Sequence, residues 1–277
     1  MIIEVKSQSF TCIPFAFFNA EKSQKAPKKV ETAVKVMQSA TPSVYVCEPL
    51  DPNVDYSRWG GKADRLFSLN REYVSPTNLN YELPTAGKPE FAFIGRSNVG
   101  KSSLVGALLG NTNLVRISRN PGCTKAVNYF KFATRKGSAE CYFIDLPGYG
   151  FARSSKSDRA KWSKTIKTFL ENRSHIILRR VYILIDSRHP IKESDVDMMN
   201  LLNECELSFQ IILTKADISS ATEKIICLQS AFQEMMSKRH ACGFPIVHIV
   251  SSSDGSGLEA LKHSIAEIVY GDSIDID

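Results

Sequence analysis

The sequence of 277 residues lacks several features that would indicate particular classes of protein. No apolar run approaches the eighteen or so residues of a membrane span, so we expect no integral membrane segment. The seven cysteines are odd in number and include no Cys-x-x-Cys pair, which argues against a disulfide framework and a zinc site. No secretory signal is apparent. We therefore expect a soluble intracellular protein in a reducing compartment.

Arginine is absent before Arg58, whereas targeting peptides of organelles are usually rich in arginine. Residues 1–60 show little other pattern, so a targeting extension and a disordered segment both stay open for them. Residues 61–88 are polar and rich in turn residues, and we interpret them as a lead-in segment. The globular domain is predicted at residues 89–270, followed by an acidic tail at residues 271–277.

Acidic residues are scarce in the middle third of the chain. Residues 91–180 carry 17 Lys and Arg against 4 Asp and Glu, whereas residues 181–277 carry 7 against 15. Such a concentration of positive charge favours a polyanionic partner, and RNA is the partner that we expect. A solvated face that only aids solubility is the alternative.

The apolar pattern predicts an α/β fold. Short apolar runs at residues 91–94, 181–185, 209–213 and 245–250 predict buried strands, and residues 129–134 and 140–145 predict a hairpin. Helical spacing follows at residues 101–109, 158–172, 193–205, 220–239 and 258–270, while residues 114–128 are predicted to form a loop. Strands that alternate with helices favour a mostly parallel sheet with helices on both faces.

One stretch carries the clearest chemical signal. The first apolar run ends in Gly95-Arg-Ser-Asn-Val-Gly100-Lys101-Ser102, which is the Gly-x4-Gly-Lys-Ser pattern of a phosphate-binding loop between a strand and a helix. The glycines let backbone N–H groups point at phosphate oxygens, and the helix N-terminus adds its dipole. Lys101 would reach the β- and γ-phosphates, and Ser102 would ligate Mg2+.

Three further motifs follow predicted strands and together indicate a GTPase: Asp145-Leu-Pro-Gly148, Thr214-Lys215-Ala216-Asp217, and Ser251-Ser252, whose backbone groups could contact the guanine O6. Asp145-Leu-Pro-Gly148 offers an acid for the Mg2+ hydration shell and an N–H for the γ-phosphate. Asp217, in Thr214-Lys215-Ala216-Asp217, can accept both N1–H and N2–H of guanine, which adenine does not offer. Thr124 would be a second Mg2+ ligand that arrives only with a γ-phosphate. An adenine-nucleotide enzyme is a weaker alternative.

These motifs predict a set of site residues. The catalytic residues are predicted to be Lys101, Thr124 and Gly148, and the metal ligands Ser102, Thr124 and, through water, Asp145. The predicted GTP-binding residues are Gly95, Arg96, Ser97, Asn98, Val99, Gly100, Lys101, Ser102, Gly122, Cys123, Thr124, Lys125, Ala126, Asp145, Leu146, Pro147, Gly148, Thr214, Lys215, Ala216, Asp217, Val250, Ser251 and Ser252.

The motifs resemble those of the EngB (YihA/YsxC) GTPases, which belong to a superfamily that includes Era and TrmE. The resemblance covers roughly residues 89–270 and is most specific in Asp145-Leu-Pro-Gly-Tyr-Gly and Asp186-Ser-Arg-His-Pro. It implies a Ras-like P-loop GTPase fold with a six-stranded sheet and a role in assembly of the large ribosomal subunit. It also implies an organellar ribosome, in a mitochondrion or plastid, if the source is eukaryotic, and a link to cell division and septation in bacteria.

The sequence departs from its relatives at two motifs. Cys123 and Lys125 replace the usual residues around Thr124, whereas the predicted Mg2+ ligand itself is retained. Thr214 stands where GTPases in general have asparagine; this fits EngB but removes one structural hydrogen-bonding amide.

The residue after Asp-x-x-Gly predicts slow turnover. Ras-like enzymes have a glutamine there that orients the attacking water, whereas this chain has Tyr149. The resemblance to TrmE-type GTPases implies one compensation, a K+ ion held by Asn98; the alternative is that Asn98 only shapes the loop.

The leading hypothesis is a monomeric, Mg2+-dependent GTPase that binds GTP and GDP and acts as a switch on ribosomal RNA or a precursor of the large ribosomal subunit. The alternative is a GTP-gated binding module or scaffold with negligible hydrolysis.

Overall fold

The computed structural model describes residues 45–47, 57–74, 87–117, 127–149, 165–173, 176–235 and 241–271. Its named elements are β1 (Tyr45–Cys47), α2 (Ser57–Phe67), β2 (Asn70–Val74), β3 (Glu90–Gly95), α3 (Lys101–Leu109), α4 (Thr112–Ile117), β4 (Asn128–Ala133), β5 (Ala139–Asp145), β6 (Leu178–Asp186), α6 (Glu193–Glu204), β7 (Phe209–Thr214), α7 (Ala221–Met235), β8 (Gly243–Ile249) and α8 (Leu258–Tyr270). Residues 165–171 are also helical.

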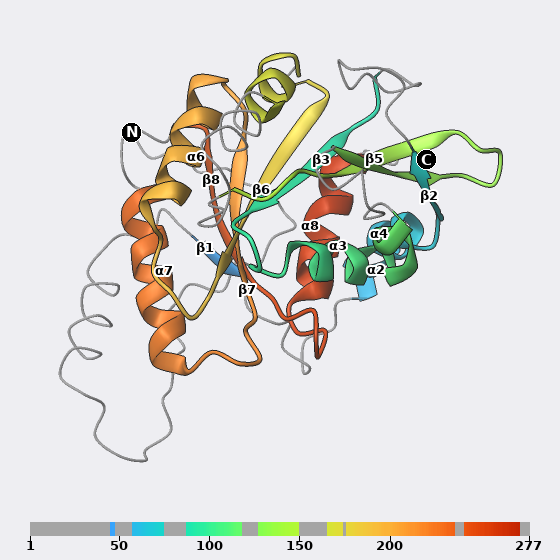
Figure 1. Ribbon diagram of the computed structural model, residues 1–277. Helices are drawn as coiled ribbons and strands as arrows, with labels where there is room; N and C mark the ends of the chain where they lie inside the picture. Colours follow the sequence, from blue (N-terminus) through green and yellow to red (C-terminus); the bar gives the residue numbers. More distant parts are fainter. Residues whose placement is uncertain are drawn as a thin grey trace, which may run out of the picture.

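A single sheet forms the centre of the molecule, with helices on both faces (Figure 1). The strand order is β1-β8-β7-β6-β3-β5-β4-β2; β4 pairs antiparallel with β5 and β2, and the other pairs are parallel. The predicted α/β class and mostly parallel sheet are confirmed. The sheet has eight strands instead of six, because β1 and β2 add one strand at each edge of the six that were predicted.

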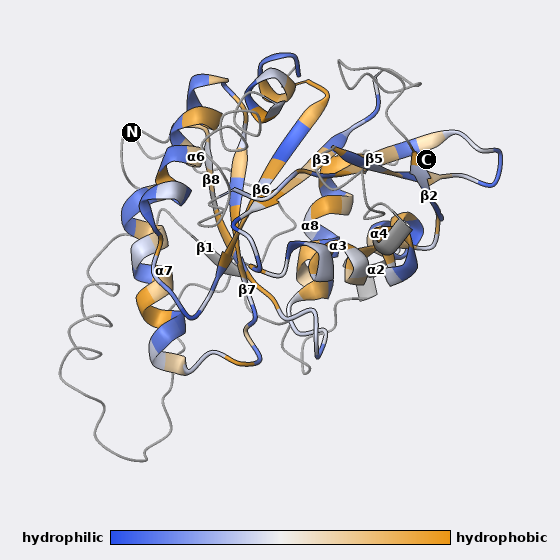
Figure 2. Ribbon diagram, viewed as in Figure 1, coloured by the Kyte–Doolittle hydropathy of each residue, from blue (hydrophilic) through white to orange (hydrophobic). Residues whose placement is uncertain are grey.

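The central strands are mostly apolar and almost entirely buried, because helices cover both of their faces. Every residue of β3 and β7 is buried, and only one residue of β6 is exposed. Continuous apolar runs of this kind are typical of parallel strands between two helical layers. Figure 2 shows these hydrophobic strands at the centre and hydrophilic residues on the outer turns of α6 and α7.

Two apolar cores lie on the two faces of the sheet. On one face, Met199 and Leu202 of α6 and Cys227 of α7 pack against alternate residues of the strands. On the other face, helices α2, α3, α4 and α8 contribute residues such as Leu66, Leu104 and Ile265. The carboxyl ends of β3, β5, β6 and β7 therefore meet at one edge of a doubly covered sheet, which is where ligands bind in such folds.

The interpretation of residues 61–88 as a lead-in that precedes the domain is wrong for the described part of that segment. Helix α2 packs against α8, and Ala63 and Leu66 are buried in the core. Lys62 Nζ lies 3.0 Å from Glu267 Oε2, and Arg65 lies over the Tyr270 ring. Strand β2 then extends the sheet beyond β4, so the domain includes α2 and β2.

Two other predictions differ locally from the structure. Residues 112–117 form the short helix α4, although a loop was predicted from residue 114; Val115 packs into the core and stabilises this turn. The predicted helix over residues 158–172 is described only at residues 165–171, and its first part lies outside the described residues. Helix α7 is described as ending at Met235, and residues 236–239 of its predicted span also lie outside.

Cys141, Cys205, Cys227 and Cys242 are free thiols. Burial raises the pKa of Cys227 to about 12, so this thiol is neutral. None of the helices within the described ranges is both long and apolar enough to cross a membrane.

Candidate functional site

The phosphate-binding loop connects β3 to α3, as predicted. Asn98 and Gly100 both have left-handed backbones, with φ of 64° and 98°, and this turns the chain back on itself before the helix. The backbone N–H groups of Gly100, Lys101, Ser102 and Ser103 form no hydrogen bond within the described part of the chain. Such N–H groups at a helix N-terminus bind anions, so the loop can hold phosphate.

Two glycines allow the phosphate loop to lie close to β6 and to the segment that follows β5. A Cβ added at Gly95 would lie 2.8 Å from the Leu184 carbonyl oxygen, and one at Gly148 would lie 3.0 Å from the Gly95 carbonyl oxygen. The backbone of Tyr149 is joined to the loop in both directions: its N–H donates to Gly95 O at 3.1 Å, and its carbonyl accepts from Ser97 N at 3.2 Å. The Asp145–Gly148 segment is thus fixed beside the phosphate loop.

Lys101 and Asp145 form an ion pair at the centre of the site. Their side chains are only 12% and 6% exposed, and Ser102 lies half-buried directly after Lys101. The hydroxyl of Ser102 and the carboxylate of Asp145 are oxygen ligands of the kind that Mg2+ prefers. The described ranges contain no group of three or more His, Cys, Asp or Glu side chains that could hold a metal by themselves, here or at another place. These residues therefore fit the predicted Mg2+ site, in which the nucleotide supplies further oxygen ligands.

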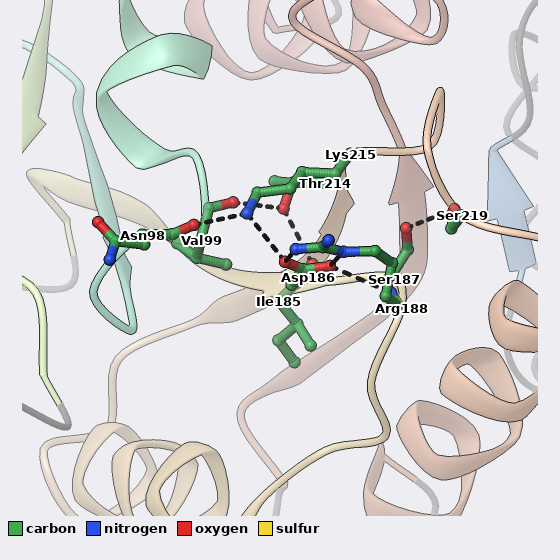
Figure 3. Close-up of polar contacts among 9 residues, drawn as sticks. All are labelled: Asn98, Val99, Ile185, Asp186, Ser187, Arg188, Thr214, Lys215 and Ser219. Atoms are coloured by element: carbon green, nitrogen blue, oxygen red, sulfur yellow. Dashed lines mark hydrogen bonds and ion pairs between the residues drawn. The ribbon is translucent and has the colours of Figure 1, made fainter. Parts of the chain in front are cut away.

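Residues at the end of β7 and directly after it reach back to the phosphate loop (Figure 3). The Thr214 hydroxyl lies 2.6 Å from the Val99 carbonyl oxygen and 3.1 Å from that of Ile185. Lys215 Nζ donates to the Asn98 carbonyl oxygen at 2.7 Å. Threonine, which was expected to lose an amide contact relative to asparagine, still makes a hydrogen bond to the phosphate loop through its hydroxyl.

Asp186, at the end of β6, pairs with two cations. Its Oδ2 lies 2.9 Å from Lys215 Nζ and 2.7 Å from an Arg188 guanidinium nitrogen, and Arg188 Nε donates to its Oδ1 at 2.9 Å (Figure 3). Burial by itself would raise the pKa of Asp186, but hydrogen bonds from Arg188 and Lys215 outweigh it and hold that pKa well below its usual range. Asp186 thus stays ionised and fixes the ammonium of Lys215.

Asp217 is exposed and oriented for a ligand. The Ser251 hydroxyl donates to Asp217 Oδ1 at 2.9 Å, and this serine is itself fully buried. The Ala216 N–H donates to the Val250 carbonyl oxygen at 3.2 Å, which joins the two loops. Asp217 Oδ2 is left to accept from a base, as guanine recognition requires.

Tyr149 is not placed to orient water. Its hydroxyl donates to Asp195 Oδ1 at 2.8 Å, and its side chain is buried. Burial, and then the negative charge of Asp195, raise the pKa of this phenol well above its usual value, so it remains a donor. The second carboxylate contact of Asp195 comes from the phosphate loop, where Arg96 Nε lies 3.2 Å from the same oxygen.

The structure brings together the predicted residues of the phosphate loop, the Asp145–Gly148 segment and the Asp217 and Ser251 loops. The first-switch residues lie outside the described residues: Gly122, Cys123, Thr124, Lys125 and Ala126. Seven of the 17 basic residues that favoured RNA also lie outside: Arg119, Lys125, Arg153, Lys156, Arg159, Lys161 and Lys164. Arg135 and Lys136 are exposed on the turn between β4 and β5, whereas Lys131 pairs with Glu72.

Sequence reasoning missed three roles: Asp186 holding Lys215, the Ser251 hydroxyl orienting Asp217, and Asp195 contacting both Arg96 and Tyr149. The signal for Asp186 was an acid at a strand end, beside the other site motifs. The other two roles depend on contacts between distant parts of the chain.

A phosphate loop between strand and helix, an acid at the end of the neighbouring strand and an exposed, oriented Asp217 define a P-loop GTPase. Consistent with this class, residues 90–215 match the family model described as "50S ribosome-binding GTPase". The Ras-like fold is also seen in solved structures. A crystal structure of a probable GTP-binding protein EngB matches 65% of this chain and 98% of its own, with a TM-score of 0.52 and 22% identity. A bacterial selenocysteine-specific elongation factor EF-Sec matches 66% of this chain and 29% of its own, with a TM-score of 0.51 and 16% identity.

Curated relatives identify the family. The chain is 43% identical to the probable GTP-binding protein EngB of Rhodospirillum rubrum over 203 residues, which cover 73% of this chain and 86% of that protein. It is 37% identical to the corresponding protein of Cereibacter sphaeroides over 221 residues, or 79% of this chain and 97% of that one. The chain belongs to the EngB family of GTP-binding proteins and is a GTPase.

Proposed function

We propose that this protein is a Mg2+-dependent GTPase that acts as a nucleotide switch in assembly of the large ribosomal subunit. The observation that carries the nucleotide part is the exposed Asp217 carboxylate, oriented by Ser251, on a loop that Thr214 and Lys215 join to the phosphate loop. One site can thus bind guanine and phosphates together. Ser102, Asp145 and the first-switch Thr124 would hold Mg2+, which neutralises charge on the phosphates.

The ribosomal part is supported by the description of the matched family model and by the positive charge of residues 91–180. RNA is a polyanion, and a basic surface beside nucleotide-sensing loops would make its binding depend on GTP. If the source is eukaryotic, the particle would be organellar. The family's link to cell division is a secondary proposal, tested by cell morphology after depletion.

The base assignment is tested by Asp217→Asn. The variant should lose GTP affinity and gain affinity for xanthosine triphosphate, because an amide can donate to the xanthine carbonyl where a carboxylate cannot. Asp197→Asn is a matched control, since Asp197 is also exposed but lies on α6. Unchanged GTP binding in Asp217→Asn would contradict the guanine assignment.

A second candidate function is a GTP-gated binding module with negligible hydrolysis. It is favoured by the burial of Tyr149 against Asp195, which leaves no side chain at that position to orient water. Single-turnover hydrolysis with and without large ribosomal subunits separates the two. Stimulation by the subunit supports the switch, whereas absence of turnover under all conditions supports the module. Co-sedimentation in GTP and in GDP then shows whether binding is nucleotide-dependent.

A K+ ion near Asn98 is a further proposal for charge compensation. The exposed side chain of Asn98 leaves it accessible, although its left-handed backbone equally supports a role in shaping the loop. Equal hydrolysis rates in Na+ and K+ buffers would contradict the K+ proposal.

A further inference from the structure

Asp195 lies in the first turn of α6, outside the predicted nucleotide motifs, and its side chain is fully buried. Its carboxylate accepts three hydrogen bonds from three segments of the chain. Oδ1 accepts from Tyr149 OH at 2.8 Å and from Arg96 Nε at 3.2 Å, and Oδ2 accepts from Lys192 N at 2.9 Å. A buried carboxylate requires such partners, because an unpaired buried charge is strongly unfavourable.

One of these contacts has an ordinary structural explanation. Lys192 is the N-cap of α6, and a carboxylate three residues later that accepts the N-cap N–H is a common way to begin a helix. The contacts to Arg96 and Tyr149 are not part of helix capping. They join α6 to the phosphate loop and to the residue directly after Gly148.

The contact to Tyr149 bears on the position of Gly148. The segment is held on one side by Leu146 N, which donates to Phe93 O at 3.0 Å, and on the other by the backbone of Tyr149. Between these points the Gly148 N–H forms no hydrogen bond within the described residues. The Tyr149 side chain, held by Asp195, adds a third constraint and limits how far Gly148 can move from the phosphate loop.

We infer that Asp195 is a positioning residue that, through Tyr149 and Arg96, holds the Gly148 N–H in place for the γ-phosphate and so sets the preference of the site for GTP over GDP. The inference rests on the proposed function, in which Gly148 contacts the γ-phosphate. GDP has no γ-phosphate, so this positioning acts on GTP affinity and leaves GDP affinity nearly unchanged. A role confined to folding would change both affinities together.

Tyr149→Phe in the full chain is the decisive variant. It removes only the hydroxyl, and it leaves the helix cap and the Arg96–Asp195 pair in place. Tyr182→Phe is the matched control, because the Tyr182 hydroxyl is buried on β6 without a hydrogen-bond partner in the described residues. Asp195→Asn is a second test. The asparagine keeps an acceptor for the N-cap of α6 but leaves the Arg96 guanidinium without its counter-ion. The result for Tyr149→Phe stands even where the Asp195→Asn protein fails to fold.

The measurement is the Kd for GDP and for a non-hydrolysable GTP analogue, both with Mg2+. In Tyr149→Phe we expect the Kd for the analogue to rise about tenfold, with that for GDP changing by less than about twofold. Tyr182→Phe should match the unaltered protein. Equal weakening of both ligands, or no change in either, would overturn the inference. Failure of the unaltered protein to bind either nucleotide would instead overturn the proposed function, and the inference with it.

Discussion

Asp186 offers a sharp test of how the guanine loop is held. Asp186→Asn keeps the shape of the side chain and an acceptor oxygen, but it removes the charge that pairs with Lys215 and Arg188. The Asp186 carboxylate is only 9% exposed, so water does not replace these contacts effectively. Lys215 would keep its hydrogen bond to Asn98 O and lose its counter-ion.

The expected magnitude follows from the hydrogen bonds that lose their charge assistance. A hydrogen bond between ionised partners contributes about 1.5–3 kcal/mol, against about 1 kcal/mol for a neutral one. We therefore expect GDP binding to weaken by about 1.5 kcal/mol, roughly a tenfold rise in Kd. The free energy of unfolding should fall by a similar amount, because the pair between Asp186 and Lys215 is also present in the protein without nucleotide.

The assay compares GDP binding, followed by a fluorescent analogue, with unfolding in guanidinium chloride. Arg188→Gln is the matched control: it leaves the Asp186–Lys215 pair in place, and the Arg188 side chain is 35% exposed. We expect it to change the Kd for GDP by no more than about threefold, because exposed ion pairs contribute little.

The double variant decides whether Asp186 acts through Lys215. Lys215→Met keeps much of the aliphatic stem and removes the ammonium, so Asp186→Asn should add little to it if the two residues form one unit. Fully additive effects on the Kd for GDP would refute this explanation, as would an Asp186→Asn protein with unchanged affinity.

Three other predictions follow from the structure. Gly257→Ala should lower the free energy of unfolding by about 3 kcal/mol or more, because Gly257 has a φ of 73° and a Cβ there would lie 2.0 Å from a carbonyl oxygen. Gly255 also has a left-handed backbone, but the space around it is open, so Gly255→Ala should lower the free energy of unfolding by only about 1 kcal/mol. Chemical denaturation measures both values. Burial raises the pKa of Glu90 to about 7, so above pH 4.5 the folded state keeps a proton that the unfolded chain has lost. The free energy of unfolding should therefore fall by up to about 3 kcal/mol as the pH rises from 4.5 to 8. Glu90→Gln should flatten this pH dependence when unfolding is measured in urea. Removal of Mg2+ with EDTA should weaken GTP binding at least about tenfold in the unaltered protein and much less in Ser102→Ala. Calorimetry measures the affinity in both proteins. An equal loss in both would exclude Ser102 as a metal ligand.

Local motifs made much of the site predictable. The phosphate loop, Asp145–Gly148 and Asp217 each lie at a strand end, and continuous apolar runs identify those strands without knowledge of tertiary contacts. The loop geometry then follows from glycine at positions with close backbone approach.

The contacts that position these motifs could not be predicted in the same way. Arg96 and Asp195 lie 99 residues apart, and nothing in either local pattern indicates that they meet. Helix α2 was missed for a related reason. Its sequence contains Gly60-Gly61, which disfavours a helix, and its stability comes from packing of residues such as Leu66 against the core. Strand β1 has three residues, too few for a periodic pattern.

The pairing of β1 with β8 affects how the chain folds during synthesis. Strands β1 and β2 are made first, yet β1 pairs with β8, whose Ile246–His248 segment is made about 200 residues later. The nascent sheet therefore keeps an open edge on this side until β8 has been made and β1 has paired with it, and open edges favour pairing with other chains. Closing so long a loop is slow because its entropy is lost before the strand pairing forms. The last step of folding should thus be the return of the N-terminal strand to the sheet, at the stage when the protein is most prone to aggregate.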